Sequence, residues 1–365
     1  MTFHHETVLL AETVDAIAPR AGGRYADATL GGGGHAEAVL ERSAPDGTLI
    51  GLDRDPRALA ASRERLARFG DRVTYVHAEF GRLRDVLAEH SIDRLDGVVA
   101  DVGVSSPQLD DATRGFSFRN AGPLDMRMNT EAGETALELI ARLDVTELAD
   151  LIYELGEERR SRAIARSIRA AFDAGELETT EDLSRAVHRV FPKRGRIDNA
   201  TRTFQALRIA VNRELDELTR LMGQLPEMLE DDGVAAVISF HSLEDRIVKW
   251  AYREEPRMIP LTKKPVIAGD EERTRNPRAR TAKLRAARGQ HEVDTQCERL
   301  AKLRPHLRIR QRAPVEHPLP VALHHPDELR SLFERPGAAG STDGRVHPLS
   351  LIHTLPCRRP TLCTS

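Results

Sequence analysis

A run of four glycines followed by a histidine, residues 31–35, is the part of the sequence best suited to hold a ligand. It follows a short apolar stretch at 25–30 that we expect to be a buried strand, and it precedes a helix expected at 36–42. A glycine has no Cβ atom, so the backbone there can take positive φ values and approach a ligand closely. The helix would then point its amide-rich N-terminus at the ligand.

Two classes of ligand use such a turn. Gly31, Gly33 and Ala36 satisfy the G-x-G-x-x-G/A pattern of dinucleotide-binding proteins, with Asp53 on the next strand as the acid that binds ribose hydroxyls. Asp27 and the glycines also satisfy the D-x-x-x-G-x-G arrangement of methyltransferases that bind S-adenosylmethionine. An acid suits that cofactor, whose methionine end carries an ammonium and a sulfonium group. The residues therefore favour the methyl donor, and the dinucleotide stays as the alternative.

Polar and aromatic residues follow two further predicted strands. Phe80 comes after a strand expected at 72–78, where its ring could stack on adenine or simply belong to the core. A strand expected at 95–100 ends in Asp101, and Ser105, Ser106 and Gln108 follow within a few residues. Open α/β sheets bind ligands beyond the carboxyl ends of their strands. These residues are therefore candidates for the same site as the glycine turn, with a capped Ser-Pro turn as the structural alternative.

The elements that would position these residues alternate between strand and helix up to residue 101. The periodicity then becomes helical for more than 100 residues, and the sheet resumes with a strand at 233–240 followed by His241. Arg208 and Asn212 form a polar pair at i, i+4 on one of these helices and could face the cleft, with solvated surface as the default for both. Ser242 and Asp245 resemble a capping box that starts another helix. We expect helices at 136–140, 145–153, 157–174, 180–190 and 200–221.

Composition sets the wider frame. The chain has 365 residues, 40% of them apolar, which is enough for a sizeable core, and its formal net charge is −3. No apolar run approaches the ~20 residues of a membrane span, and the start lacks a signal sequence. We therefore expect a cytoplasmic protein. All three cysteines lie at or after Cys297, so the body has no thiols for disulfides or metal, and we expect no metal in the site.

A basic segment lies between residues 256 and 289. It contains ten Lys or Arg residues against three acids, a local excess of seven positive charges in a chain that is acidic overall. Such a density favours contact with the phosphates of a nucleic acid. A solvated basic face is the alternative.

Eight blocks of the sequence stand out together: TVLL at 7–10, DATLGGGGH at 27–35, DVGVSSPQLD at 101–110, RGFSF at 114–118, PLDMRM at 123–128, GEER at 156–159, TFQALRI at 203–209 and SFHSLEDR at 239–246. In this order, and over residues 4 to about 288, they closely resemble the bacterial ribosomal RNA small subunit methyltransferase H family.

The resemblance implies a class I S-adenosylmethionine-dependent methyltransferase fold, a Rossmann-like α/β sheet with an inserted all-helical domain. It implies transfer of a methyl group to the N4 amine of a cytidine in the decoding centre of 16S rRNA, conventionally position 1402, within the small ribosomal subunit. It also implies cofactor contacts at Gly33, Gly34, His35, Asp53, Phe80, Asp101 and Gln108.

The resemblance and the periodicity together divide the chain into four segments. Residues 1–108 form the first part of the methyltransferase domain, 109–213 the helical insertion, 214–289 the second part with the basic segment, and 290–365 a divergent tail that we expect to be disordered. The tail has no counterpart in the family pattern, and its His and Cys residues lack a recognisable metal-ligand spacing.

The chemistry that this family carries out needs an acceptor for the amino proton, because an amine conjugated to a pyrimidine is a poor nucleophile. Asp101, Ser105 and Ser106 are the candidates for that catalytic work. DNA amino-methyltransferases usually carry Asp/Asn-Pro-Pro-aromatic after the fourth strand, and this chain does not. A dinucleotide oxidoreductase and a non-catalytic RNA-binding factor are the remaining alternatives. The sequence leaves open whether the protein is a monomer or a homodimer.

Overall fold

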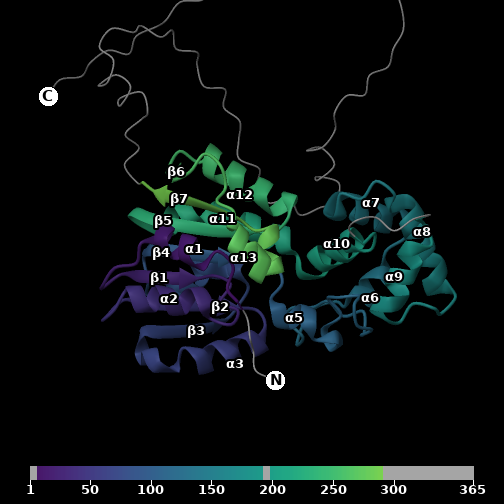
Figure 1. Ribbon diagram of the computed structural model, residues 1–365, viewed down its shortest axis with the longest axis horizontal. Helices are drawn as coiled ribbons and strands as arrows, with labels where there is room; N and C mark the ends of the chain where they lie inside the picture. The colour runs from purple at the N-terminus through teal and green to yellow at the C-terminus, as the bar shows by residue number, and fades with distance from the viewer. Residues whose placement is uncertain (1–5, 192–197, 291–365) are drawn as a thin grey trace, which may run out of the picture. The chain divides into compact units, whose positions relative to one another are not determined.

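A seven-stranded sheet forms the centre of the computed structural model, which describes residues 6–191 and 198–290 (Figure 1). The strand order is β3-β2-β1-β4-β5-β7-β6. Strands β3, β2, β1, β4 and β5 run parallel, whereas β7 is antiparallel to β5 and β6 is antiparallel to β7. The strands are β1 (Arg24–Asp27), β2 (Thr48–Asp53), β3 (Val73–His77), β4 (Leu95–Asp101), β5 (Leu229–Ser239), β6 (Met258–Pro260) and β7 (Lys283–Gly289).

Helices cover both faces of this sheet, because side chains alternate between the faces along each strand. In β4, Val98 and Ala100 join the core beneath α4, α11 and α12, whereas Val99 joins the core beneath α1, α2 and α3. The helices are α1 (Leu10–Ile17), α2 (Gly34–Arg42), α3 (Pro56–Arg65), α4 (Leu83–Glu89), α11 (Glu214–Met228) and α12 (Ser242–Glu254). Both cores are apolar and almost fully buried, so the strands that carry the predicted site residues are rigid.

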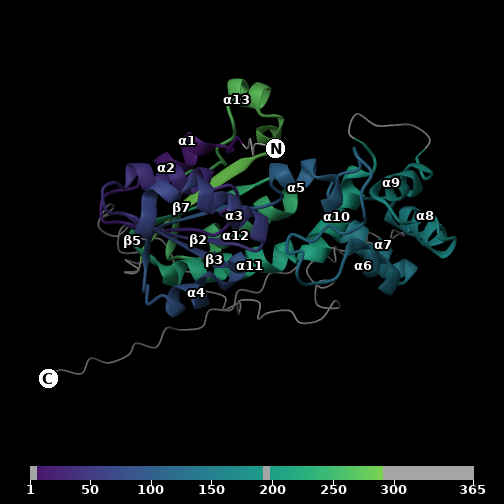
Figure 2. The same ribbon diagram turned by 90° about the horizontal axis from the view of Figure 1, so that it is seen from below.

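A helical region with its own hydrophobic core is inserted between β4 and β5. In both views α6, α7, α8 and α9 lie on the far side of α10 from the sheet (Figures 1 and 2). The helices are α5 (Ser106–Asp110), α6 (Ala136–Arg142), α7 (Val145–Gly156), α8 (Ser161–Asp173), α9 (Thr180–His188) and α10 (Thr201–Asn212).

The prediction of a single helix at 200–221 is wrong. The chain breaks at Arg213, which has a φ of 51°, into α10 and α11. The expected surface position of Asn212 is wrong as well, because its side chain is buried. Its amide Nδ2 donates to Met126 O at 2.7 Å, and its Oδ1 accepts from Met128 N at 2.8 Å. The break therefore turns Asn212 inward, where it fixes the loop that carries Met128.

The end of the sheet differs from the sequence prediction. The basic segment contains α13 (Asp270–Arg275) and two strands, of which β7 lies between β5 and β6. Its small residues Ala286 and Ala287 are buried, and the flanking arginines conceal the strand pattern. The predicted cap is also displaced: His241, not Ser242, is the N-cap of α12, and Glu244 completes the capping box.

Within the residues that the structure describes, no helix combines the length and the apolar composition that crossing a membrane requires. The predicted tail lies outside those residues except for Gln290, whose N–H donates to Arg257 O at 2.9 Å. The division into segments at residues 108, 213 and 289 stays a prediction.

Candidate active site

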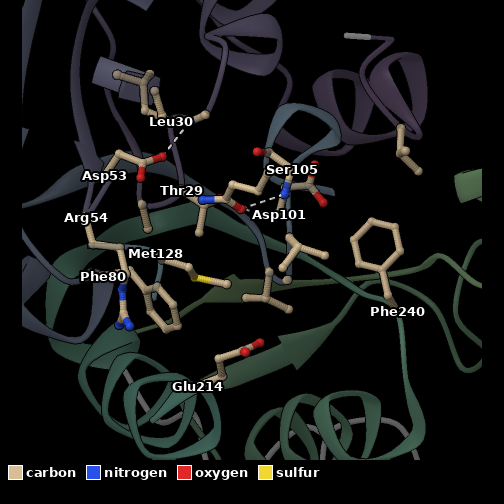
Figure 3. Close-up of a pocket in the computed structure, with 18 of the residues that line it drawn as sticks. Thr29, Leu30, Asp53, Arg54, Phe80, Asp101, Ser105, Met128, Glu214 and Phe240 are labelled. Atoms are coloured by element: carbon tan, nitrogen blue, oxygen red, sulfur yellow. Dashed lines mark hydrogen bonds between the residues drawn. The ribbon is translucent and has the colours of Figure 1, made fainter. Parts of the chain in front are cut away.

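A cavity opens beyond the carboxyl ends of β1, β2, β4 and β5, and the helical insertion closes one side of it. In Figure 3 its wall is formed by Asp53 and Asp101 from the sheet, by Met128 and Glu214 from the insertion side, and by Phe240. Seven of the predicted site residues line this cavity: Gly34, His35, Asp53, Phe80, Asp101, Ser105 and Gln108.

The other two predicted residues, Gly33 and Ser106, are not among the lining residues. Gly33 is the N-cap of α2 with a φ of 78°, and a Cβ there would lie 3.2 Å from Leu66 on the side of the helices. Ser106 begins α5, and its carbonyl oxygen lies 3.4 Å from Nη2 of Arg278. Both residues therefore shape the loops behind the cavity wall.

The glycine turn leaves no room for larger residues. Gly31 has a φ of 51°, which favours glycine. At Gly34, a Cβ would meet the Thr7 hydroxyl at 1.8 Å, so the N-terminal segment packs directly on the first turn of α2. Thr7 also lines the cavity. The turn thus holds backbone amides at the cavity and seals it from the N-terminal side.

Asp53 is held rigidly at the end of β2. Its Oδ2 accepts a hydrogen bond from Gly31 N–H and its Oδ1 accepts one from Asp55 N–H, each at 2.8 Å. Burial raises the pKa of Asp53 to about 6, although these amides oppose the shift. Each carboxylate oxygen keeps a lone pair for a ligand hydroxyl.

Phe80 and Arg54 form the wall beside Asp53. The Phe80 ring packs against the core and also lines the cavity, so it belongs to both. The Arg54 guanidinium lies 5.8 Å from the ring centroid and donates to Asn212 O at 2.6 Å. This bond connects the end of β2 to the helical insertion.

Gln108 is fixed by a buried ion pair. Its amide nitrogen donates to Asp55 Oδ2 at 2.9 Å and its oxygen accepts from Ser105 N at 3.0 Å. Asp55 caps α3, as expected of an Asp that precedes a Pro at a helix start, and also pairs with Arg114 at 2.8 Å. Arg114 in turn donates to Met128 O at 2.9 Å. One buried network therefore sets the positions of Gln108, Ser105 and Met128.

Asp101 carries an unsatisfied polar atom. Its backbone N–H donates to Thr29 Oγ1 at 2.6 Å, the contact dashed in Figure 3, but its buried Oδ1 has no hydrogen-bond partner within the described residues. Its Oδ2 lies 4.0 Å from His35 Nδ1. His35 Nε2 lies 3.1 Å from Val8 O, which can only accept, so Nε2 carries the ring proton.

Burial raises the pKa of Asp101 to about 8, and the Asp27 and Glu244 carboxylates add to the shift. Asp27 lies on the neighbouring strand β1, where burial raises its pKa to about 7. A carboxyl group with so high a pKa loses its proton readily only when a positive charge comes close. The pair therefore favours a cationic ligand in the cavity.

Two acidic residues of the cavity wall escape the sequence analysis. Glu214 receives two hydrogen bonds from Arg208, each at 2.8 Å, and both residues line the cavity, so the expected surface position of Arg208 is wrong. The break at Arg213 creates this pair, and no glycine or proline signals it. Glu244 Oε2 accepts from Phe240 N at 2.8 Å. The spacing of Glu244 from His241 was the available signal.

The basic segment is largely neutralised within the protein. Seven of its ten cations form ion pairs, among them Lys283 and Arg285, which both bind Asp245. Arg278 reaches the cavity wall, and its buried Nη1 has no hydrogen-bond partner within the described chain. Lys263, Lys264 and Arg280 form no ion pair with any described residue. The contribution of this segment to phosphate binding is therefore smaller than the count of charges indicates.

Comparison with known proteins agrees with this geometry. A model of the MraW methylase family matches residues 2–290. The chain belongs to this family. It is 61% identical over 286 residues to the ribosomal RNA small subunit methyltransferase H of Sorangium cellulosum, covering 78% of this chain and 90% of the relative. It is 50% identical over 308 residues to the protein of the same name from Geobacter sulfurreducens, covering 79% and 99%.

Membership of the MraW methylase family confirms the predicted class I methyltransferase fold and makes the protein an S-adenosylmethionine-dependent methyltransferase. The residues present fit that cofactor. Asp53 can accept ribose hydroxyls, Phe80 offers an aromatic face, and Asp101, with its unsatisfied Oδ1, lines the cavity at the end of β4. The roles of the individual residues stay predictions.

Proposed function

We propose that the protein methylates the N4 exocyclic amine of a decoding-centre cytidine, position 1402 of 16S rRNA, in the small ribosomal subunit. Two observations support this proposal: the names of the curated relatives, which specify small subunit ribosomal RNA, and the sequence blocks shared with that family. The substrate would place the activity in the cytoplasm.

In this proposal the cofactor lies across the ends of three strands. Asp53 accepts hydrogen bonds from the ribose, Phe80 contacts the adenine, and Gln108 lines the wall between them and the insertion. Gly34 and His35, at the N-terminus of α2, face the methionine end. When bound, S-adenosylmethionine supplies a methyl group activated by a sulfonium charge.

Asp101 is the residue that we propose to accept the amino proton. The bound cofactor would supply the methyl group to N4 and leave as the neutral thioether. The amine would have to lose a proton as it is methylated, and the Asp101 carboxylate would accept that proton. Without a cation beside it Asp101 is mostly protonated at pH 7, because burial raises its pKa to about 8. Once the sulfonium charge is lost, the affinity of the Asp101 carboxylate for a proton rises, at the step in which the amine must give up its proton.

The target base would enter between Ser105 and Phe240, which line the cavity beside Asp101 (Figure 3). A base must leave its stack to reach such a buried position. Ser105 offers a hydroxyl to the polar edge of the cytosine, and Phe240 offers an aromatic face. Ser106, the third residue proposed for catalysis, would act through the Arg278 contact of its carbonyl oxygen and not through direct contact with the base.

The observation that carries this proposal is the unsatisfied Oδ1 of Asp101 in the cavity wall. Its test is a comparison of Asp101→Asn with the unchanged protein by single-turnover methylation at saturating cofactor, paired with calorimetric titration of the cofactor. We expect the variant to bind the cofactor and to transfer methyl groups at least 100-fold more slowly. Full rate at saturating cofactor would show that Asp101 only binds the cofactor.

A further inference from the structure

Helix α12 presents an exposed face with one aromatic ring and three cations. Arg246, Lys249, Trp250 and Arg253 are spaced i, i+3, i+4 and i+7, so they lie on one side of the helix. All four are exposed, and Trp250 is 42% exposed. The opposite side of the helix packs Val248 into the core beneath the sheet. The outer face is therefore solvent-facing in the described structure.

The charges on this face surround the tryptophan. Lys249 Nζ lies 5.1 Å and Arg253 Cζ 5.4 Å from the Trp250 ring. Neither cation forms an ion pair with any described residue, whereas Arg246 binds Glu157 at 3.1 Å. Glu254 lies at the edge of the face and is its one exposed acid. Two free cations and an aromatic ring thus stand together.

The N-terminal end of α12 lies at the cavity. Phe240 and the buried Glu244 line the cavity there, and on the outer side of the helix Ser242 and Arg246 both hydrogen-bond to Glu157 of the insertion. Trp250 lies eight residues beyond Ser242, which is about 12 Å along the helix axis. That distance is about two nucleotides of an extended strand. A strand with one base in the cavity could therefore run along this helix.

We propose that the outer face of α12, formed by Lys249, Trp250 and Arg253, binds a single-stranded segment of the RNA that flanks the target nucleotide. A ring flanked by cations suits single strands, because any base can stack on it while the cations contact phosphates. The core of a protein interface is instead poor in lysine. A second copy of this chain would bring like charges together across a symmetric contact. The proposal rests on the proposed function only in taking RNA as the substrate.

The test uses Trp250 as a reporter, because it is the only tryptophan of the chain. The full-length protein is titrated with a single-stranded RNA that carries the sequence around the proposed target, and the tryptophan fluorescence is recorded at several salt concentrations. We expect quenching that saturates with RNA and weakens as salt rises.

Three variants locate the contact. Trp250→Ala, measured by fluorescence anisotropy of labelled RNA, should raise the RNA Kd about 5- to 150-fold, as for the loss of one stacked base. Lys249→Gln with Arg253→Gln should lower the slope of log K against log salt by about 1.4. Tyr153→Ala is the matched control, since Tyr153 is 59% exposed on α7 but stands between Asp150 and Glu154. It should bind RNA like the unchanged protein.

The readouts separate this proposal from the proposed function. All variants should have the cofactor Kd and the melting temperature of the unchanged protein. These two measurements test whether the variants are folded. Unchanged RNA affinity and salt slope in the α12 variants would overturn the α12 surface and leave the methylation proposal intact. Fluorescence that changes with protein concentration alone would identify the face as a contact between copies, which also overturns the proposal. Absence of methyl transfer to any RNA would instead overturn the proposed function.

Discussion

Replacing Asp101 with asparagine should stabilise the cofactor-free protein, and the stabilisation should grow with pH. An unfolded Asp ionises with a pKa of about 3.9, whereas burial raises the pKa of Asp101 in the fold to about 8. A raised pKa contributes stability that is fully present below pH 4 and is lost as the pH rises towards 8. Asparagine keeps the shape of the side chain but cannot ionise, so the variant does not lose this stability.

The magnitude follows from the pKa shift of Asp101. Each pH unit in this window costs the unchanged protein about 1 kcal/mol, so the loss is about 2 kcal/mol at pH 5 and about 4 kcal/mol at pH 7. The difference between the two proteins should therefore widen by about 2 kcal/mol from pH 5 to pH 7.

Urea unfolding of both proteins at pH 5, 6 and 7, without cofactor, measures this difference. The control is Asp93→Asn, which removes an exposed carboxylate from the loop before β4, away from the cavity. A difference that stays constant with pH, or an Asp101→Asn protein less stable than the unchanged one at pH 7, would refute the assignment of a desolvated acid.

Three other expectations concern the cofactor and the end of the chain. Asp53→Ala should raise the cofactor Kd, measured by calorimetry, by about ten- to hundred-fold, the effect of losing a charge-assisted contact. The rate of single-turnover methylation at saturating cofactor should stay nearly unchanged. Cofactor binding at pH 7 should release protons, because a cation lowers the raised pKa values of Asp27 and Asp101. Calorimetry in buffers of different ionisation enthalpy counts the released protons. The Asp101→Asn variant should release fewer of them than the unchanged protein. A chain that ends at Gln290 should keep its melting temperature and methyl transfer, because the family match ends there, and a large fall in either would show that later residues are required.

Much of the fold was predictable from the sequence. The parallel strands follow from short apolar runs that end in polar residues, and Asp55 and Pro56 mark the start of α3 correctly. Strand β7 was missed because each of its two faces carries a small buried alanine beside charged residues, so neither an apolar run nor a clean alternation marks it. Such a pattern has little β-propensity, and pairing with β5 supplies the stability.

The residues of the candidate site were also predicted only in part. The residues at strand ends were found because parallel strands bring their carboxyl ends together at one edge. Arg208 was a cleft candidate, but its pairing with Glu214 was missed because the two meet only through the break at Arg213, and the positive φ of an arginine there has no local sequence signal. Tertiary packing, which sequence periodicity does not record, forces that conformation.

The charge of the basic segment was a weaker guide than its density indicated. Lys283 and Arg285 are held by Asp245, which is distant in sequence, so a count within a window cannot detect the pairing. The two free cations on α12 show the opposite case: they are too few to form a run in the sequence, and the helix brings them beside Trp250.

The proposed activity is the methylation of one cytidine amine in the small ribosomal subunit. The direct measurement incubates the protein with radiolabelled S-adenosylmethionine and small subunits that lack the modification, then locates the label by nuclease mapping and identifies the nucleoside by mass spectrometry. We expect one labelled nucleotide, N4-methylated cytidine at position 1402. Label at a ring carbon, at a ribose oxygen or at another nucleotide would contradict it.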